Sequence, residues 1–243
     1  MLVLGIDTAT LVCGVALVTP QRLLAEYTLQ VRKTHSERLL PMVAAMLRDA
    51  GLTPEDLGGV AVAAGPGSFT GVRIGVATAR ALGQALGLPL VAVSTLEALA
   101  AQSPHFSGLV SPILDARRQQ VYNAVFRVPA EGPVRLGEER AMPLPELLAE
   151  LKEYGEPVLF TGDAVPVYRE LITEAFGPQA CFLPLEAGLS RAASVARLGL
   201  TRLVAGGGVP FRDLLPQYVR RSEAETKSQA GCREGGCSPG TDL

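Results

Sequence analysis

The chain has 243 residues, of which 48% are hydrophobic and 19% charged, and its formal net charge is −2. This length predicts one or two packed domains, and the composition excludes global disorder. The near balance of charge argues against a strongly basic surface for general nucleic-acid binding.

The first half of the chain predicts strands that give way to alternating helices and strands. Runs of β-formers and apolar periodicity define the elements. In chain order they are strands over 2–6, 12–18 and 24–31, a helix over 35–50, a strand over 60–64, a helix over 72–87, a strand over 90–93 and a helix over 95–102.

The second half repeats this layout. Its predicted elements are strands over 109–114 and 121–126, a strand over 158–161, a helix over 164–175, a strand over 180–183 and a helix over 190–200. The first strand of each half ends in an aspartate, Asp7 and Asp115, and a gap-free alignment of the two places 121–126 over 13–18. We therefore expect an α/β fold with two duplicated lobes around a cleft. The alternative is the chance similarity that any α/β protein shows between its halves.

The same reading predicts the domain boundaries. The N-terminal lobe covers 1–105 and the smaller C-terminal lobe covers 106–204, while residues 205–221 pack back on the body. Residues 222–243 contain one leucine and no other large apolar residue, so they are expected to form a disordered tail.

The number and spacing of the histidines and cysteines restrict the kinds of metal and thiol sites that the chain can form. The two histidines, His35 and His105, are far apart in sequence, and no His-x-x-x-His motif occurs, so no metal site is expected. Cys13 and Cys181 lie in apolar strands and are interpreted as buried thiols in a reducing compartment. No apolar run approaches the ~20 residues of a membrane span, and no charged leader precedes the first strand. We expect a cytoplasmic protein with no membrane partner.

Two segments are candidates for facing a phosphate group. Residues 7–10 follow the end of a strand, where such folds bind ligands and where a carboxylate can hold Mg²⁺ through water. Residues 65–71 join a buried strand to a helix start, but they lack the Gly-Lys-[Ser/Thr] ending of a Walker A loop. A hairpin-closing turn and a structural tight turn are the alternatives. The candidate residues are Asp7, Thr8, Thr10, Gly65, Gly67, Ser68, Thr70 and Arg73.

The two helices over 35–50 and 72–87 carry more apolar residues than one sheet-facing stripe requires. Such an excess predicts a partner protein or a self-dimer. Deep burial within the chain is the alternative. The candidate interface residues are Leu39, Leu40, Val43, Met46, Leu47, Val72, Val76, Ala79, Arg80 and Gly83.

Several motifs together resemble the bacterial TsaB (YeaZ) family, over about residues 1–221. The most specific is the long glycine-rich segment 65–75. The full set is Ile6-Asp7-Thr8-Ala9-Thr10, His35-Ser36-Glu37-Arg38-Leu39-Leu40-Pro41, Gly65-Pro66-Gly67-Ser68-Phe69-Thr70-Gly71-Val72-Arg73-Ile74-Gly75, Val93-Ser94-Thr95-Leu96, Asp115-Ala116-Arg117 and Pro216-Gln217-Tyr218-Val219-Arg220. The resemblance implies the actin-like/sugar kinase/Hsp70 ATPase fold, which agrees with the duplication.

The resemblance also implies a function without catalytic residues in this chain. The family member is a scaffold that pairs with and activates TsaD, which carries the metal-binding histidines. TsaD transfers the threonylcarbamoyl group from threonylcarbamoyl-AMP to N6 of the adenosine 3′ of the anticodon in tRNAs reading ANN codons. TsaE joins as an ATPase, the chain contacts tRNA through the complex, and it forms a homodimer when alone. ATP or ADP with Mg²⁺ is expected only in the complex.

The rival hypothesis is a stand-alone ATP-dependent kinase or ATPase of the same fold. It would use Asp7 for Mg²⁺ and residues 65–71 for the phosphates. Against it, the second half offers only Asp115-Ala116-Arg117 where an Asp-x-Gly phosphate loop would help.

Overall fold

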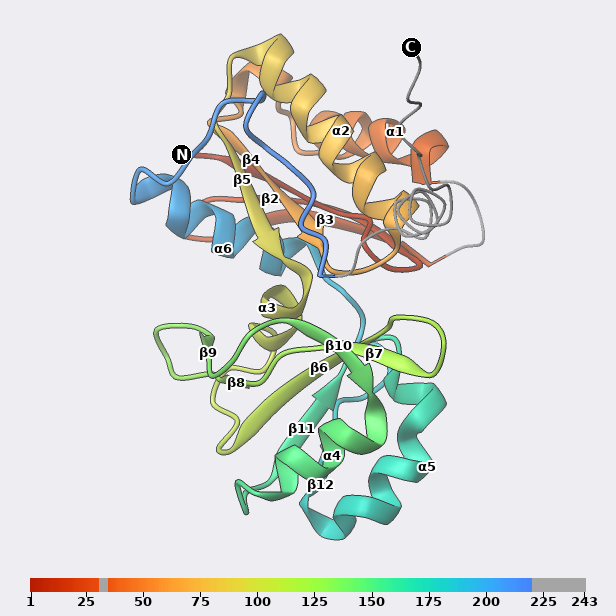
Figure 1. Cartoon of the computed structure of the whole chain (residues 1–243). Coiled ribbons are helices and arrows are strands. Elements are labelled where there is room, and N and C mark those ends of the chain that lie inside the picture. Colours follow the sequence, from red (N-terminus) through yellow and green to blue (C-terminus); the bar gives the residue numbers. More distant parts are fainter. Residues whose placement is uncertain (31–34, 220–243) are drawn as a thin grey trace, which may run out of the picture.

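The computed structural model describes residues 1–30 and 35–219. Each of its two lobes is built on a mixed β-sheet (Figure 1). The first lobe contains β1 (Val3–Asp7), β2 (Val12–Val18), β3 (Leu23–Gln30), α1 (His35–Asp49), η1 (Pro54–Asp56), β4 (Gly59–Gly65), α2 (Phe69–Leu86), β5 (Leu90–Ser94) and α3 (Thr95–Ala100). The second contains β6 (Leu109–Asp115), β7 (Gln120–Asn123), β8 (Phe126–Arg127), β9 (Val134–Arg135), β10 (Arg140–Pro143), α4 (Leu144–Lys152), β11 (Val158–Thr161), α5 (Val165–Phe176), η2 (Gly177–Gln179) and β12 (Ala180–Phe182), and α6 (Ala192–Val204) follows.

The two sheets have the same topology. The first runs β3-β2-β1-β4-β5 and the second β10-β7-β6-β11-β12, with β8 and β9 attached beside β6. In each, the first strand (β1 or β6) pairs antiparallel with the next strand in the chain (β2 or β7) and parallel with the strand on its other side (β4 or β11). The predicted α/β fold with two duplicated lobes is therefore confirmed. The gap-free alignment is wrong by one residue, because Asp7 pairs with Gly14 whereas Asp115 pairs with Val121.

The last helix of each half packs on the other lobe, which corrects the predicted boundaries. α6 contacts β1, β2 and β4 of the first sheet, although residues 106–204 were expected to form the second lobe. Conversely, α3 shares a buried cluster with β6, β8 and β11, and it lies between the lobes in Figure 1. Close approach of α6 depends on small residues: a Cβ at Gly5 would lie 2.4 Å from the Ala192 carbonyl oxygen, and one at Gly199 would lie 2.1 Å from the Ala61 Cβ.

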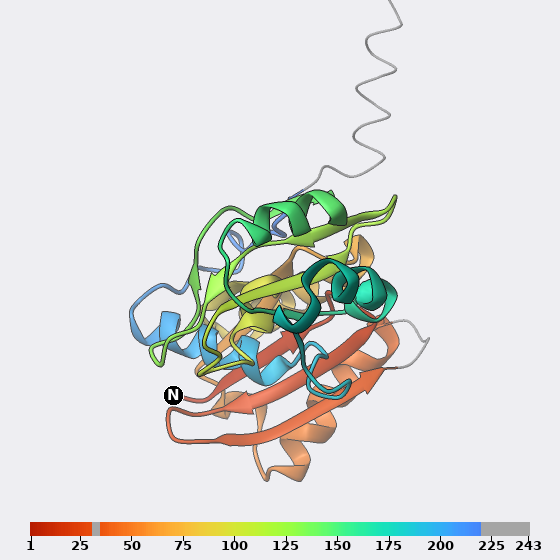
Figure 2. The same ribbon diagram turned by 90° about the horizontal axis from the view of Figure 1, so that it is seen from below.

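Successive residues along β1 face opposite sides of the first sheet, each side being covered by a different layer of helices. The Asp7 side chain faces the side of α6, as would a Cβ added at Gly5, while Ile6 and Thr8 face α2. Seen from below, β1–β3 run side by side, with the orange helices on one side of them and the blue α6 on the other (Figure 2). The central strands β1, β2 and β4 are buried throughout, which explains their unbroken apolar sequences.

The segment that follows α6 returns to the first lobe. Val209 forms an isolated bridge with Leu90, Leu214 is 1% exposed, and the Gln217 amide donates to the Ala64 carbonyl oxygen at 2.7 Å. This segment, residues 206–219, runs beside α2. The tail predicted over 222–243 lies outside the described residues.

Candidate functional site

The glycine-rich segment is clamped onto the loop that follows β1. The Thr8 hydroxyl donates to the Gly71 carbonyl oxygen at 2.8 Å, and the Ser68 amide donates to the Ala9 carbonyl oxygen at 2.7 Å. A Cβ at Gly67 would lie 2.3 Å from the Ala9 oxygen, and one at Gly71 would lie 2.0 Å from the Thr8 oxygen. These glycines are therefore required for contact between two backbones. The space beside the glycine-rich segment is filled by the loop that follows β1.

Asp7 is fully buried and its carboxylate is already engaged. Oδ1 accepts the Ala9 amide at 3.0 Å, and Oδ2 accepts the hydroxyl of Ser190, which precedes α6. Burial raises the pKa of Asp7 above its ordinary value of 3.8, and the Ser190 and Ala9 hydrogen bonds together with the charge of His35 oppose that rise only in part. The side chain fixes the turn after β1 to the segment before α6.

The structure places the eight candidate phosphate-facing residues in different surroundings and does not bring them together at one site. Asp7 and Thr8 point to opposite faces of the first sheet. The Thr10 hydroxyl accepts the Val12 amide, and the Ser68 hydroxyl caps α2. A Cβ at Gly65 would lie 2.3 Å from the Gln217 oxygen, Gly67 is closed by Ala9, and Thr70 and Arg73 are exposed on α2. Of the groups that could hold Mg²⁺-nucleotide here, the Asp7 carboxylate and the Ser68 and Gly71 amides are bonded within the chain.

The corresponding loop of the second lobe has an unusual backbone. Arg117, Arg118 and Gln119 all have positive φ, at 64°, 53° and 60°, a conformation uncommon for residues other than glycine. The Asp115 amide donates to Asp163 at 3.0 Å. Burial and the charge of Asp115 raise the pKa of Asp163. This loop, too, is held by hydrogen bonds within the chain.

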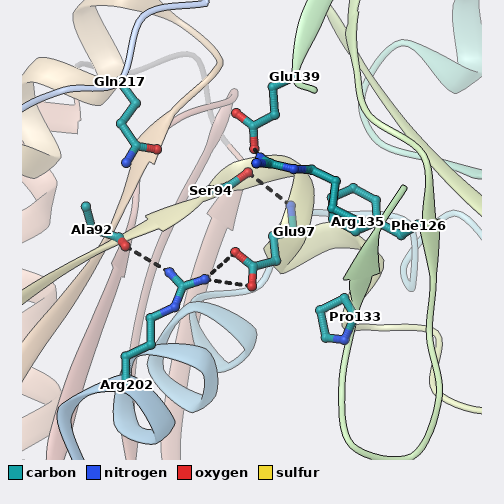
Figure 3. Close-up of a pocket in the computed structure, with 9 residues that line it drawn as sticks. All are labelled: Ala92, Ser94, Glu97, Phe126, Pro133, Arg135, Glu139, Arg202 and Gln217. Carbon is teal, nitrogen blue, oxygen red and sulfur yellow. Dashed lines mark hydrogen bonds and ion pairs between the residues drawn. The ribbon is translucent and has the colours of Figure 1, made fainter. Parts of the chain in front are cut away.

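A polar pocket of about 310 Å³ lies where the two lobes meet beside α3. Figure 3 shows Arg202 reaching from α6 to the Ala92 carbonyl oxygen, at 2.9 Å, and to the Glu97 carboxylate, at 2.5 and 2.7 Å. Arg135 and Glu139 approach from the second lobe and form their own ion pair at 3.1 Å. Because each charge has a partner, the pocket offers no unpaired charge to a ligand; Arg202 instead ties α6 to α3.

A second, mainly apolar cavity of about 400 Å³ separates residues 10–12 of the first lobe from residues 161–163 of the second. We call it the interlobe cavity. Of the candidate residues, only Thr10 lines it. Within the described ranges, no group of three His, Cys, Asp or Glu side chains is placed to hold a metal ion.

Most of the predicted interface residues are core residues, which corrects that prediction. The first sheet covers the apolar sides of both helices, and their buried residues belong to one cluster with those of its strands. Of the ten candidates, only Leu40, at 53%, is well exposed, and Arg80 is half-buried. The buried ones are Leu39, Val43, Met46, Leu47, Val72, Val76, Ala79 and Gly83.

The exposed sides of α1 and α2 nevertheless carry small apolar residues. Both helices cover the same face of the first sheet and contact one another, so their exposed sides point away from it. We call this surface the α1/α2 face; its apolar members are Leu40, Pro41, Ala44, Ala77, Ala81 and Ala85.

An aromatic cluster borders the α1/α2 face at the start of α2. The rings of Phe69 and Tyr218 stack with centroids 5.2 Å apart. The Arg73 guanidinium lies 3.8 Å from the Phe69 centroid, and its Nε donates to the Tyr218 hydroxyl at 2.8 Å. The sequence does not predict this cluster, because Arg73 and Tyr218 are 145 positions apart and no pattern links them.

The repeated sheet order and the exchanged helices define a protein of the actin-like/sugar kinase/Hsp70 ATPase fold. The family described as "TsaD: tRNA N6-adenosine threonylcarbamoyltransferase" matches residues 23–228. The Bacillus subtilis tRNA threonylcarbamoyladenosine biosynthesis protein TsaB is 38% identical over 93% of this chain and 97% of its own length. The Escherichia coli TsaB is 38% identical over 62% of this chain and 65% of its own.

Solved structures agree with these relatives. YeaZ from Pseudomonas aeruginosa superposes with a TM-score of 0.72 and 27% identity, over 89% of this chain and 99% of its own. A P. aeruginosa protein described as similar to the peptidase YeaZ gives 0.75 and 28%, over 90% and 99%. The chain therefore belongs to the TsaB (YeaZ) family, within the wider family that the TsaD match describes. Among the described residues, no helix combines the length and apolarity needed to cross a bilayer.

Proposed function

We propose that this chain is the non-catalytic subunit that pairs with and activates a TsaD protein. TsaD then catalyses the transfer of the threonylcarbamoyl group from threonylcarbamoyl-AMP to N6 of the tRNA adenosine 3′ of the anticodon. TsaE joins the pair, and the complex binds tRNA in the cytoplasm. Mg²⁺ with ATP or ADP is bound by the complex and not by this chain alone. Without a TsaD protein, the chain pairs with itself.

The observation that carries this proposal is the α1/α2 face. Alanines at positions 77, 81 and 85 recur every four residues, so they form one stripe where the backbone of a second helix can approach closely. Leu40 and the Phe69–Arg73–Tyr218 cluster supply larger side chains beside it, and aromatic and arginine residues commonly dominate interface energies. A standard interface of about 1,600 Å² would extend beyond this stripe onto both helices.

The stand-alone kinase is less well supported, because Asp7 and the glycine-rich segment are engaged within the chain. Calorimetry of the isolated chain with Mg²⁺-ATP separates the two functions. We expect no saturable heat; tight binding coupled to turnover would favour the kinase.

Reconstitution tests the proposal directly. TsaD, TsaE, tRNA, ATP and threonylcarbamoyl-AMP are combined with and without this chain, and modified adenosine is measured by mass spectrometry of the digested tRNA. We expect modification only when the chain is present. Equal modification in its absence would overturn the proposed role.

A further inference from the structure

Arg73 is held in one orientation by two aromatic residues at the start of α2. Its guanidinium carbon lies 3.8 Å from the centroid of the Phe69 ring and 5.9 Å from that of the Tyr218 ring. Its Nε also donates to the Tyr218 hydroxyl at 2.8 Å. These contacts restrict the rotation of a long side chain, so less conformational entropy remains to be lost when its other nitrogens bind a ligand.

The two terminal nitrogens of this guanidinium have no partner among residues 1–30 and 35–219. Nη1 and Nη2 make no hydrogen bond or ion pair there, whereas Nη2 of Arg191 and Nη2 of Arg202 are each bonded to a carboxylate. Arg73 and both rings are exposed, so a second molecule can reach the fork that Nη1 and Nη2 form. Such a fork binds a carboxylate or a phosphate through two parallel hydrogen bonds.

The charges on α1 and α2 favour an acidic protein surface as the source of that group. The two helices carry more arginines than carboxylates, although the whole chain has a net charge of −2. The arginines are Arg38, Arg48, Arg73 and Arg80, and the carboxylates are Glu37 and Asp49. Asp49 already pairs with Arg48 and accepts from the Tyr27 hydroxyl. RNA is bound by surfaces that are more basic and more polar than this partly apolar one.

We propose that Arg73 binds a carboxylate of the partner TsaD protein through Nη1 and Nη2. Arg73 lies one helical turn before Ala77, so a helix that packs along the alanines also covers the guanidinium. A charge pair that is shielded from water in this way contributes more to affinity than an exposed pair does. This inference rests on the proposed pairing with TsaD and adds the chemistry of the partner surface, an aspartate or glutamate opposite Arg73.

Calorimetric titration of TsaD with variants of the full chain, without tRNA, tests this pairing. Arg73→Gln removes the charge and the fork, whereas Arg73→Lys keeps the charge on a single ammonium group. Arg169→Gln is the matched control: Arg169 is also exposed and lies 4.2 Å from the centroid of an aromatic ring, that of Phe182, but it belongs to the second lobe. Both glutamine variants lose one positive charge, so a difference between them reports a local contact.

We expect the affinity for TsaD to fall at least tenfold in Arg73→Gln and to stay within about twofold in Arg169→Gln. Arg73→Lys should bind more tightly than Arg73→Gln but more weakly than the unaltered chain. Raising the NaCl concentration from about 0.05 to about 0.5 M should weaken binding of the unaltered chain more than binding of Arg73→Gln, because only the unaltered chain forms the ion pair. Circular dichroism checks the fold of each variant.

Charge reversal identifies the carboxylate. Arg73→Glu is titrated against TsaD variants in which each exposed aspartate or glutamate is changed in turn to arginine. One of these variants should bind Arg73→Glu at least tenfold more tightly than unaltered TsaD does. Rescue by none of them contradicts the assigned carboxylate.

The outcomes separate this inference from the proposed function. If the unaltered chain binds TsaD and Arg73→Gln binds it as tightly, the inference is wrong while the pairing stands. If the unaltered chain does not bind TsaD, the proposed function fails and the inference fails with it. If Arg73→Gln keeps its affinity for TsaD but lowers the affinity of the complex for tRNA, the fork binds an RNA phosphate, which also overturns the inference.

Discussion

Replacing Gly71 by alanine tests the contact between the glycine-rich segment and the loop after β1. The added Cβ would lie 2.0 Å from the Thr8 carbonyl oxygen and 3.2 Å from its carbonyl carbon. Both are backbone atoms, so no side-chain rotation can relieve the clash, and the start of α2 has to move away from β1. That movement also lengthens the hydrogen bond from the Thr8 hydroxyl to Gly71.

The expected cost follows from two opposing effects. Overpacking of this kind costs about 1–3 kcal/mol, and a clash with backbone lies at the upper end. Alanine recovers up to about 1 kcal/mol through its helix propensity. The net loss of about 2 kcal/mol corresponds to a decrease in Tm of roughly 4–8 °C for a protein of this size.

Thermal unfolding followed by circular dichroism measures the effect, with Gly137→Ala as the matched control. A Cβ at Gly137 meets nothing within 4 Å, so the Tm of this variant should stay within about 2 °C of the Tm of the unaltered chain. If Gly71→Ala is as stable as the control, the two loops are not in the contact described, and the segment is free to accept a ligand.

Two further predictions concern buried titratable groups. Because burial raises the pKa of Asp7, its folded form holds the proton more tightly, and the chain loses stability as pH rises from about 3.8 through the raised pKa. In Asp7→Asn the amide oxygen can accept from Ala9 and the amide nitrogen can donate to Ser190, so the Tm of the variant relative to the unaltered chain should increase as the pH rises above about 4; a constant difference would contradict the assigned burial. Burial also raises the pKa of the Cys13 thiol to about 11, so iodoacetamide should alkylate Cys181 well before Cys13, as peptide mass spectrometry would show. The reverse order would mean that β2 is more accessible than described.

The sequence predicts the strands of the first sheet well, because central strands buried on both faces appear as unbroken apolar runs. It misses β9, β10 and α4, although Leu144, Leu147, Leu148 and Leu151 of α4 have helical spacing and are buried. Their apolar pattern follows two short strands, of two and four residues, which are too short to show a clear periodicity.

The exchange of α3 and α6 between lobes is beyond what periodicity can predict. The small residues that let α6 approach the first sheet, Ala192, Ala196 and Gly199, would suit either sheet. Likewise, counting apolar residues on α2 does not reveal that residues 206–219 return to pack beside it. The predicted interface therefore fell on core residues such as Val76, where a charge would unfold the chain instead of testing a partner surface.

Direct binding to TsaD tests the central claim that the α1/α2 face is the pairing surface. Ala77→Arg places a long charged side chain on that face, and Ala149→Arg makes the same change on the exposed side of α4 in the second lobe. Calorimetric titration of TsaD with each variant should show binding weakened at least tenfold by Ala77→Arg and unchanged by Ala149→Arg. Equal affinity for both variants would place the partner elsewhere and contradict the account.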